Sequence, residues 1–112
     1  MPIRQVVILR NGPQVPASQT GLDVADIRCA RTGRVRTAYV YCRAIAGTTT
    51  VDILKNNVSM LTAVVTPVAD AQTAASLDFS KTAVAVGDRL SFEVTTAAAS
   101  TLDDCNVTLD LG

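Results

Sequence analysis

Residues 47–111 read GTTTVDILKNNVSMLTAVVTPVADAQTAASLDFSKTAVAVGDRLSFEVTTAAASTLDDCNVTLDL. Two runs in this stretch, 90–94 and 105–111, alternate strictly between apolar and polar residues. Successive residues of a β-strand point to opposite faces, so this period of two puts one set in a core and the other in water. The apolar set of the two runs is Leu90, Phe92, Val94, Cys105, Val107, Leu109 and Leu111.

Turn residues divide the whole chain into about eight short strands, which is typical of a sandwich or barrel. The strongest turn signals are Asn11-Gly12, Lys55-Asn56-Asn57 and Gly87-Asp88, because Asn and Gly tolerate positive φ. The expected strands are 4–10, 22–29, 34–46, 48–54, 58–66, 74–79, 89–95 and 105–111. We expect an all-β fold, a single antiparallel β-sandwich with jelly-roll topology.

The longest β-like run is 34–46, RVRTAYVYCRAIA. Its expected core face consists of Arg36, Ala38, Val40, Cys42 and Ala44. The opposite face would then present two tyrosines flanked by arginines to solvent; it consists of Val35, Thr37, Tyr39, Tyr41 and Arg43.

The chain has 112 residues, which suits one domain. Pro13 and Pro16 fit poorly in a central strand, so residues 1–20 are expected to form an N-terminal arm or an edge hairpin. Residues 21–112 would form the sandwich. No apolar run reaches the length of a transmembrane helix, and we expect no membrane contact.

The residue inventory argues against enzymatic chemistry. The chain has no histidine, the commonest general base, and no phosphate-binding or zinc pattern. We therefore expect no catalytic residue, no metal, no cofactor and no small-molecule substrate. Three cysteines, Cys29, Cys42 and Cys105, are expected to be small buried residues, with a Cys42–Cys105 disulfide left open as an alternative.

Charge is unevenly distributed although the net charge is zero. Residues 1–47 hold seven arginines against two aspartates, a net +5, whereas residues 48–112 hold three cations against eight acids, a net −5. Folding either interleaves the two halves and cancels the field, or leaves a polarised surface that docks on a charged partner or on a second copy.

The arginine cluster at 28–36 has three readings: a solvated face, a protein-docking surface, or phosphate contacts with nucleic acid. Because the chain is neutral overall and offers little stacking surface, we expect no nucleic acid partner. The candidate protein-interface residues are Arg4, Arg10, Arg28, Arg31, Arg34, Arg36, Tyr39 and Tyr41.

Several motifs together resemble a recurrent β-sandwich module of tailed-bacteriophage structural proteins, namely capsid decoration (head-fibre or cement) proteins and tail-fibre domains. The motifs are the GTTTVDI run at 47–53, the hairpin at 55–57, AVGDRL at 85–90, VTL at 107–109, and VILRNG at 7–12 followed by QVPA at 14–17. Two positions depart from the pattern. Asn57 stands where glycine is usual, and Leu54 stands where a polar residue is common, so Leu54 is expected to contact a neighbouring subunit.

The resemblance implies a virion structural protein, not an enzyme, that decorates or cements the capsid by binding the major capsid protein. The alternative it leaves open is a tail-fibre, receptor-binding or tail-adaptor module. It further implies a homo-oligomer, with a trimer as the first expectation, located at the virion surface after synthesis in the host bacterial cytoplasm. In this interpretation residues 1–20 and 28–36 contact the shell and the acidic sandwich faces outward.

Overall fold

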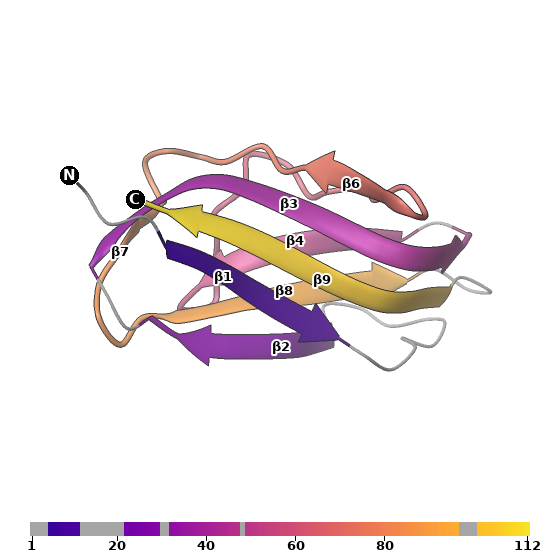
Figure 1. Ribbon diagram of the computed structural model, residues 1–112, viewed down its shortest axis with the longest axis horizontal. Coiled ribbons are helices and arrows are strands. Elements are labelled where there is room, and N and C mark those ends of the chain that lie inside the picture. Colours follow the sequence, from indigo (N-terminus) through magenta and orange to yellow (C-terminus); the bar gives the residue numbers. More distant parts are fainter. Residues whose placement is uncertain (1–4, 12–21, 30–31, 48, 97–100) are drawn as a thin grey trace.

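Two antiparallel β-sheets stacked face to face make up the computed structural model (Figure 1). It describes residues 5–11, 22–29, 32–47, 49–96 and 101–112, and for 5–11, 22–26 and 101–104 it describes the backbone alone. The described residues contain no helix, and hence none long and apolar enough to span a bilayer. The all-β sandwich expected from the sequence is thereby confirmed.

The first sheet has the strand order β1-β9-β3-β6, with the short β7 also paired to β3. Its strands are β1 (Gln5–Asn11), β3 (Gly33–Ala46), β6 (Ala71–Ala74), β7 (Ala83–Val84) and β9 (Thr101–Leu111). The second sheet has the order β2-β8-β4-β5. Its strands are β2 (Leu22–Arg28), β4 (Thr49–Lys55), β5 (Val58–Ser59) and β8 (Arg89–Thr96).

Strands that follow each other in sequence often lie in different sheets. β1 pairs with β9, the last strand, rather than with β2, its neighbour in sequence. The region expected to be an arm or edge hairpin therefore contains an edge strand of the sandwich. The jelly-roll connectivity stays a prediction; what supports it is this order, in which the first and last strands are neighbours and β2 pairs with β8 in the opposite sheet.

The core lies between the sheets and consists of slender aliphatic side chains around one aromatic ring, Phe92. All seven apolar residues of the two alternating runs are buried, as predicted from their period. Ser91, on the opposite face of β8, is also only 1% exposed, and Leu54 beside it is 5% exposed. Because Leu54 is already buried within one chain, the expectation that it contacts a neighbouring subunit is wrong.

A β-bulge in β3 changes which residues face the core. The register of β3 against β9 shifts between Val35 and Thr37. The extra residue moves Val35 into the core, where it is fully buried, and leaves both Arg36 and Thr37 exposed. The predicted core face of β3 is thus confirmed at Ala38, Val40 and Cys42 and wrong at Arg36.

Other sequence predictions for this part of the chain also differ from the structure. Ala44, predicted to face the core, is exposed, while Ile45 packs partly against the core. The expected strand 58–66 ends at Ser59, the strand expected at 74–79 lies instead at Ala71–Ala74, and β9 begins at Thr101. Beyond β5 and β6, isolated bridges such as Leu61–Leu77 replace continuous ladders, so residue propensity alone misplaced these boundaries.

A disulfide joins Cys42 on β3 to Cys105 on β9. The two residues are direct register partners, with their Cα atoms 4.1 Å apart, and both are fully buried. The alternative that the sequence left open is thus the one the structure adopts for this pair. Cys29 is a buried free cysteine, as expected for a small apolar residue.

Replacing the central aromatic residue tests the core. Phe92→Ala removes the largest fully buried side chain and should lower the free energy of unfolding by about 3–5 kcal/mol. Val86→Ala is the matched control, because Val86 is 66% exposed and its truncation should change stability by less than about 0.5 kcal/mol. Urea unfolding followed by circular dichroism measures both, and equal losses would contradict the assignment of the core.

Removing the disulfide tests its part in stability. It closes a loop with a sequence separation of 63, so the double variant Cys42→Ala/Cys105→Ala should lose about 4 kcal/mol, chiefly because its unfolded chain is less constrained. The measurement is urea unfolding with and without dithiothreitol. The reductant should lower wild-type stability and leave the double variant unchanged; no effect on the wild type would mean that the bond does not form.

Candidate docking surface at one end of the sandwich

Four segments meet at the end of the sandwich where β7 and the C-terminus lie (Figure 1). They are the end of β2, the start of β3, the β4–β5 hairpin and the turn from β7 to β8. Positively charged side chains gather on them. We call this surface the basic end; its cations are Arg28, Arg34, Arg36, Lys55 and Arg89.

Two of the sequence motifs contact each other at the basic end. The hairpin residues Asn56 and Asn57 have φ values of 50° and 66°, the left-handed conformation that asparagine tolerates. The Asn56 side-chain amide donates to Asp88 Oδ1 at 3.1 Å, and its oxygen accepts from the backbone N–H of Arg89 at 2.9 Å. The hairpin and the Gly-Asp turn, more than 25 residues apart in sequence, thus form one hydrogen-bonded unit.

Asp88 is the acceptor at the centre of this unit. Its Oδ2 accepts from the backbone N–H of Ala85 at 2.9 Å, closing the turn in which Gly87 takes a φ of 90°. The Ala85 hydrogen bond first, and the Asn56 hydrogen bond second, lower the pKa of the Asp88 carboxyl below its ordinary value. Asp88 is therefore ionised at neutral pH and holds the turn through charge-assisted hydrogen bonds.

Three of the cations bind backbone carbonyls of neighbouring loops. Arg28 Nη1 donates to the carbonyl of Gly87 at 3.1 Å, and Lys55 Nζ donates to that of Ala83 at 2.8 Å. Arg34 Nη1 donates to the carbonyl of Phe79 at 2.7 Å and to Thr82 Oγ1 at 3.2 Å. Because the acceptors are neutral oxygens, these hydrogen bonds fix the loops without neutralising the positive charge of the side chains.

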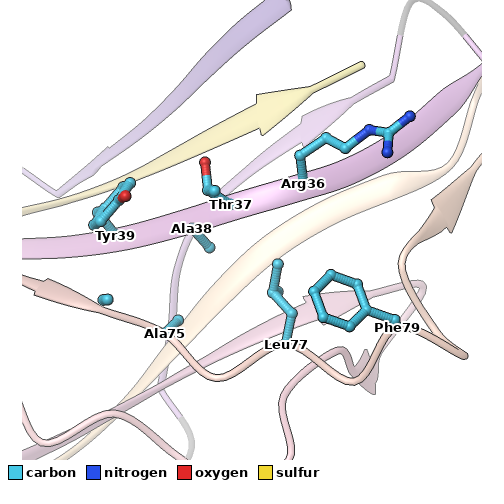
Figure 2. Close-up of a pocket in the computed structure, with 8 residues that line it drawn as sticks. Arg36, Thr37, Ala38, Tyr39, Ala75, Leu77 and Phe79 are labelled. Carbon is cyan, nitrogen blue, oxygen red and sulfur yellow. The ribbon is translucent and has the colours of Figure 1, made fainter.

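Arg36 lies differently, beside a shallow hollow (Figure 2). The described residues give its guanidinium no hydrogen-bond or ion-pair partner. The hollow has a volume of about 110 Å³, and Phe79 at its rim is 62% exposed. Its lining residues are Arg36, Thr37, Ala38, Tyr39, Ala74, Ala75, Leu77 and Phe79.

The remaining predicted interface residues do not all join this surface. Tyr41 lies farther along β3, where its hydroxyl donates to Asp70 Oδ1 at 2.6 Å. Arg10 pairs with Asn106, which is also the partner of Tyr41, so its backbone belongs to that part of the sheet. Arg4 and Arg31 fall outside the described residues. The basic end therefore includes Arg28, Arg34 and Arg36, with Tyr39 in the hollow beside Arg36.

Folding interleaves the two halves of the chain but does not remove the polarity. β1 and β2, from the basic half, pair with β9 and β8 from the acidic half. Two carboxylates, Asp52 and Glu93, nevertheless stand directly opposite each other on β4 and β8. Like charges at such a pair destabilise a sheet, and Asp52 is held there by a hydrogen bond that it accepts from Ser59 Oγ at 2.6 Å.

The described side chains form no metal-binding cluster. No group of three or more Cys, Asp or Glu side chains in that part of the chain is placed to hold a metal ion. Burial first, and the negative charge of Asp88 second, raise the pKa of the Cys29 thiol. Cys29 is thus a protonated thiol at neutral pH and a weak nucleophile.

Sequence reasoning missed three residues of this surface, Phe79, Lys55 and Arg89. Phe79 lies at the end of the strand expected at 74–79, but in the structure only Ala75 and Leu77 of that run pack against the core, and Phe79 is exposed. Lys55 was expected only as a turn residue. The motif Asp78-Phe79-Ser80 carried a signal for the first, because Asp78 accepts from both the Ser80 backbone and hydroxyl, a local turn that ends a strand.

Comparisons with protein-family models, curated proteins and solved structures find no match for this chain.

Acid unfolding tests the Asp88 unit. A carboxyl whose pKa is lowered on folding stabilises the protein at neutral pH, and that contribution disappears as the pH falls from about 3.8, the ordinary value, through the lower folded pKa. Asp88→Asn should therefore be less stable than the wild type at pH 7, and this deficit should shrink between about pH 4 and pH 2.

Asp78→Asn provides an independent comparison. The pKa of Asp78 is lowered mainly by the Ser80 side chain, and Asp78 shares no partner with Asp88 among the described contacts. The two pH-dependent losses should therefore add in the double variant. Thermal unfolding followed across this pH range gives the result. A constant difference between Asp88→Asn and the wild type at every pH would contradict the linkage.

Proposed function

We propose that this chain is a non-enzymatic structural protein of a tailed-phage virion that decorates or cements the capsid by docking its basic end on the major capsid protein. The family resemblance of the sequence motifs suggests the setting. The observation that carries the docking assignment is that Arg36 and Phe79, an exposed cation and an exposed aromatic residue, line the same hollow (Figure 2).

Arginine and aromatic side chains are the residue types enriched at protein interfaces. Within the described residues the Arg36 guanidinium has no partner, and its fork of donors suits a carboxylate of a docking protein. Phe79 and Tyr39 supply apolar area that would leave water in the complex. A partner side chain with an aliphatic body and a neighbouring carboxylate would satisfy both.

The surrounding loops support docking because they are already fixed. The Asn56–Asp88 contact and the backbone bonds of Arg28, Arg34 and Lys55 hold the segments of the basic end in one arrangement. A surface that does not have to be ordered on binding loses less conformational entropy in the complex. This rigidity suits a protein that adds mechanical support to a shell.

The size of the hollow favours a protein partner over a small ligand. Its volume of about 110 Å³ is below the roughly 300–1,000 Å³ of sites that enclose drug-sized molecules. A hollow of this size accommodates one projecting side chain. That favours capsid docking over the alternative of a receptor-binding module with a sugar pocket.

A binding assay with phage heads that lack this chain tests the proposal. Purified wild-type protein should co-sediment with the heads. Arg36→Glu should weaken binding about tenfold or more, equivalent to about 1.4 kcal/mol, because it places a negative charge against the expected carboxylate. The dissociation constant comes from a titration of heads at constant protein concentration.

Arg43→Glu is the matched control, with the same charge reversal at an exposed position of the same strand but away from the basic end. It should bind like the wild type. Equal loss in both variants would mean that overall charge, not the basic end, drives attachment. Failure of the wild-type protein to co-sediment would remove the capsid assignment altogether.

A further inference from the structure

Among the described strands, five lie at sheet edges, and four of these carry features that prevent pairing with another strand. β5 and β7 have two residues each and β6 has four, too short for a stable ladder. β2 has seven residues, but its register against β8 is interrupted between Asp23 and Ala25, and it carries the three charged residues Asp23, Asp26 and Arg28. Short length, bulges and charge are the means by which proteins protect sheet edges.

β1 has none of these features. Its seven residues, QVVILRN, pair with β9 without a register shift. The strand contains no proline, has four consecutive apolar residues, Val6 to Leu9, and carries one charge, Arg10. No described strand pairs with its other edge. A regular, apolar, unpaired edge is a template for strand addition.

We propose that β1 pairs antiparallel with β1 of a second copy of this chain, across a two-fold axis at Ile8. The two sheets that contain β1 would then join into one continuous sheet through the dimer. An interface about a two-fold axis uses the same surface on both subunits, so the strand must be complementary to itself.

The sequence of β1 meets that condition. With Ile8 opposite Ile8, the other pairs are Val7 with Leu9, Val6 with Arg10, and Gln5 with Asn11. Apolar residues face each other at the centre, the two amides pair at both ends, and the two arginines are kept apart. No like charges stand opposite each other, which is the main source of destabilisation at cross-strand pairs.

Charge adds to the match. Val6 pairs with Asp110 within one subunit. Arg10 of the second copy would stand beside Val6, in the same row as Asp110 and two strand spacings away, about 10 Å. The opposite charges attract across the new interface at that distance, although salt weakens the effect.

The backbone supplies most of the attraction. A seven-residue antiparallel pair makes about six to eight new main-chain hydrogen bonds. The β1 sequence is complementary to itself in this register. A strand from an unrelated protein would pair as well only if it shared this sequence pattern. This proposal concerns association between copies of the chain and does not depend on capsid binding.

Light scattering coupled to size-exclusion chromatography, over micromolar to millimolar concentrations, tests the proposal. The wild-type mass should rise from the 11.7 kDa of the monomer to twice that value. Ile8→Lys should remain monomeric at every concentration, because two lysines would face each other across the axis. Ile8 is the register partner of Thr108, a half-exposed position, so the substitution spares the core.

Two further variants separate edge pairing from other causes. Ile8→Glu should also be monomeric alone, and an equal mixture of Ile8→Lys and Ile8→Glu should recover dimers, because opposite charges then meet at the axis. Ile27→Lys is the matched control. It makes the same change at an isoleucine that is 42% exposed on the protected edge β2, and it should dimerise like the wild type.

Circular dichroism confirms that each variant keeps a cooperative thermal transition. A wild-type protein that stays monomeric at millimolar concentration, or that forms trimers, would overturn the proposal. So would dimers of Ile8→Lys, or equal loss of dimers in Ile27→Lys. Absence of recovery in the mixed sample would also overturn the two-fold register at Ile8.

Discussion

The pairing of β3 with β9 is the interaction on which the rest of the structure depends. Every other strand of that sheet is hydrogen-bonded to one of these two: β1 to β9, and β6 and β7 to β3. The disulfide between Cys42 and Cys105 joins them at a direct register pair inside the core. Because a slip by one residue would turn every side chain to the other face, a covalent bond at one pair fixes the register of these two central strands.

The bulge in that pairing links the core to the candidate docking surface. It lets Val35 join the core while Arg36 and Thr37 both stay outside. The segment that follows β6 packs Ala75 and Leu77 against the core nearby and leaves Phe79 exposed. The bulge therefore places Arg36 and Thr37 among the residues that line the hollow, opposite the segment that carries Leu77 and Phe79 (Figure 2).

At the basic end, hydrogen bonds between polar groups hold the loops together, whereas apolar packing holds the two sheets together. The loops there expose most of their surface, yet hydrogen bonds hold them in place. Asn56 donates to Asp88, which also accepts from the Ala85 backbone. Arg28 and Arg34 donate to backbone carbonyls of neighbouring loops. The hairpin and the Gly-Asp turn, two of the strongest turn signals in the sequence, are thus in direct contact in the folded chain.

The strand content and most strand positions could be predicted from the sequence, because alternation at 90–94 and 105–111 and the turns at Asn56 and Gly87 depend on local geometry alone. The positions of the shorter strands could not, since Ala71–Ala74 pairs with β3 through neighbours far away in sequence. For the site, the sequence identified Arg34, Arg36 and Tyr39 but not Phe79.

By itself, the sequence determined that the chain is all-β and which residues of the two alternating runs are buried. Only the tertiary structure decided that Cys42 meets Cys105, that a bulge separates Val35 from Arg36, and that β1 forms an edge. The reason is physical. Side-chain alternation and turn conformation are properties of a few neighbouring residues, whereas register, bulges and edges are properties of a pair of strands, and the partners are distant in the chain.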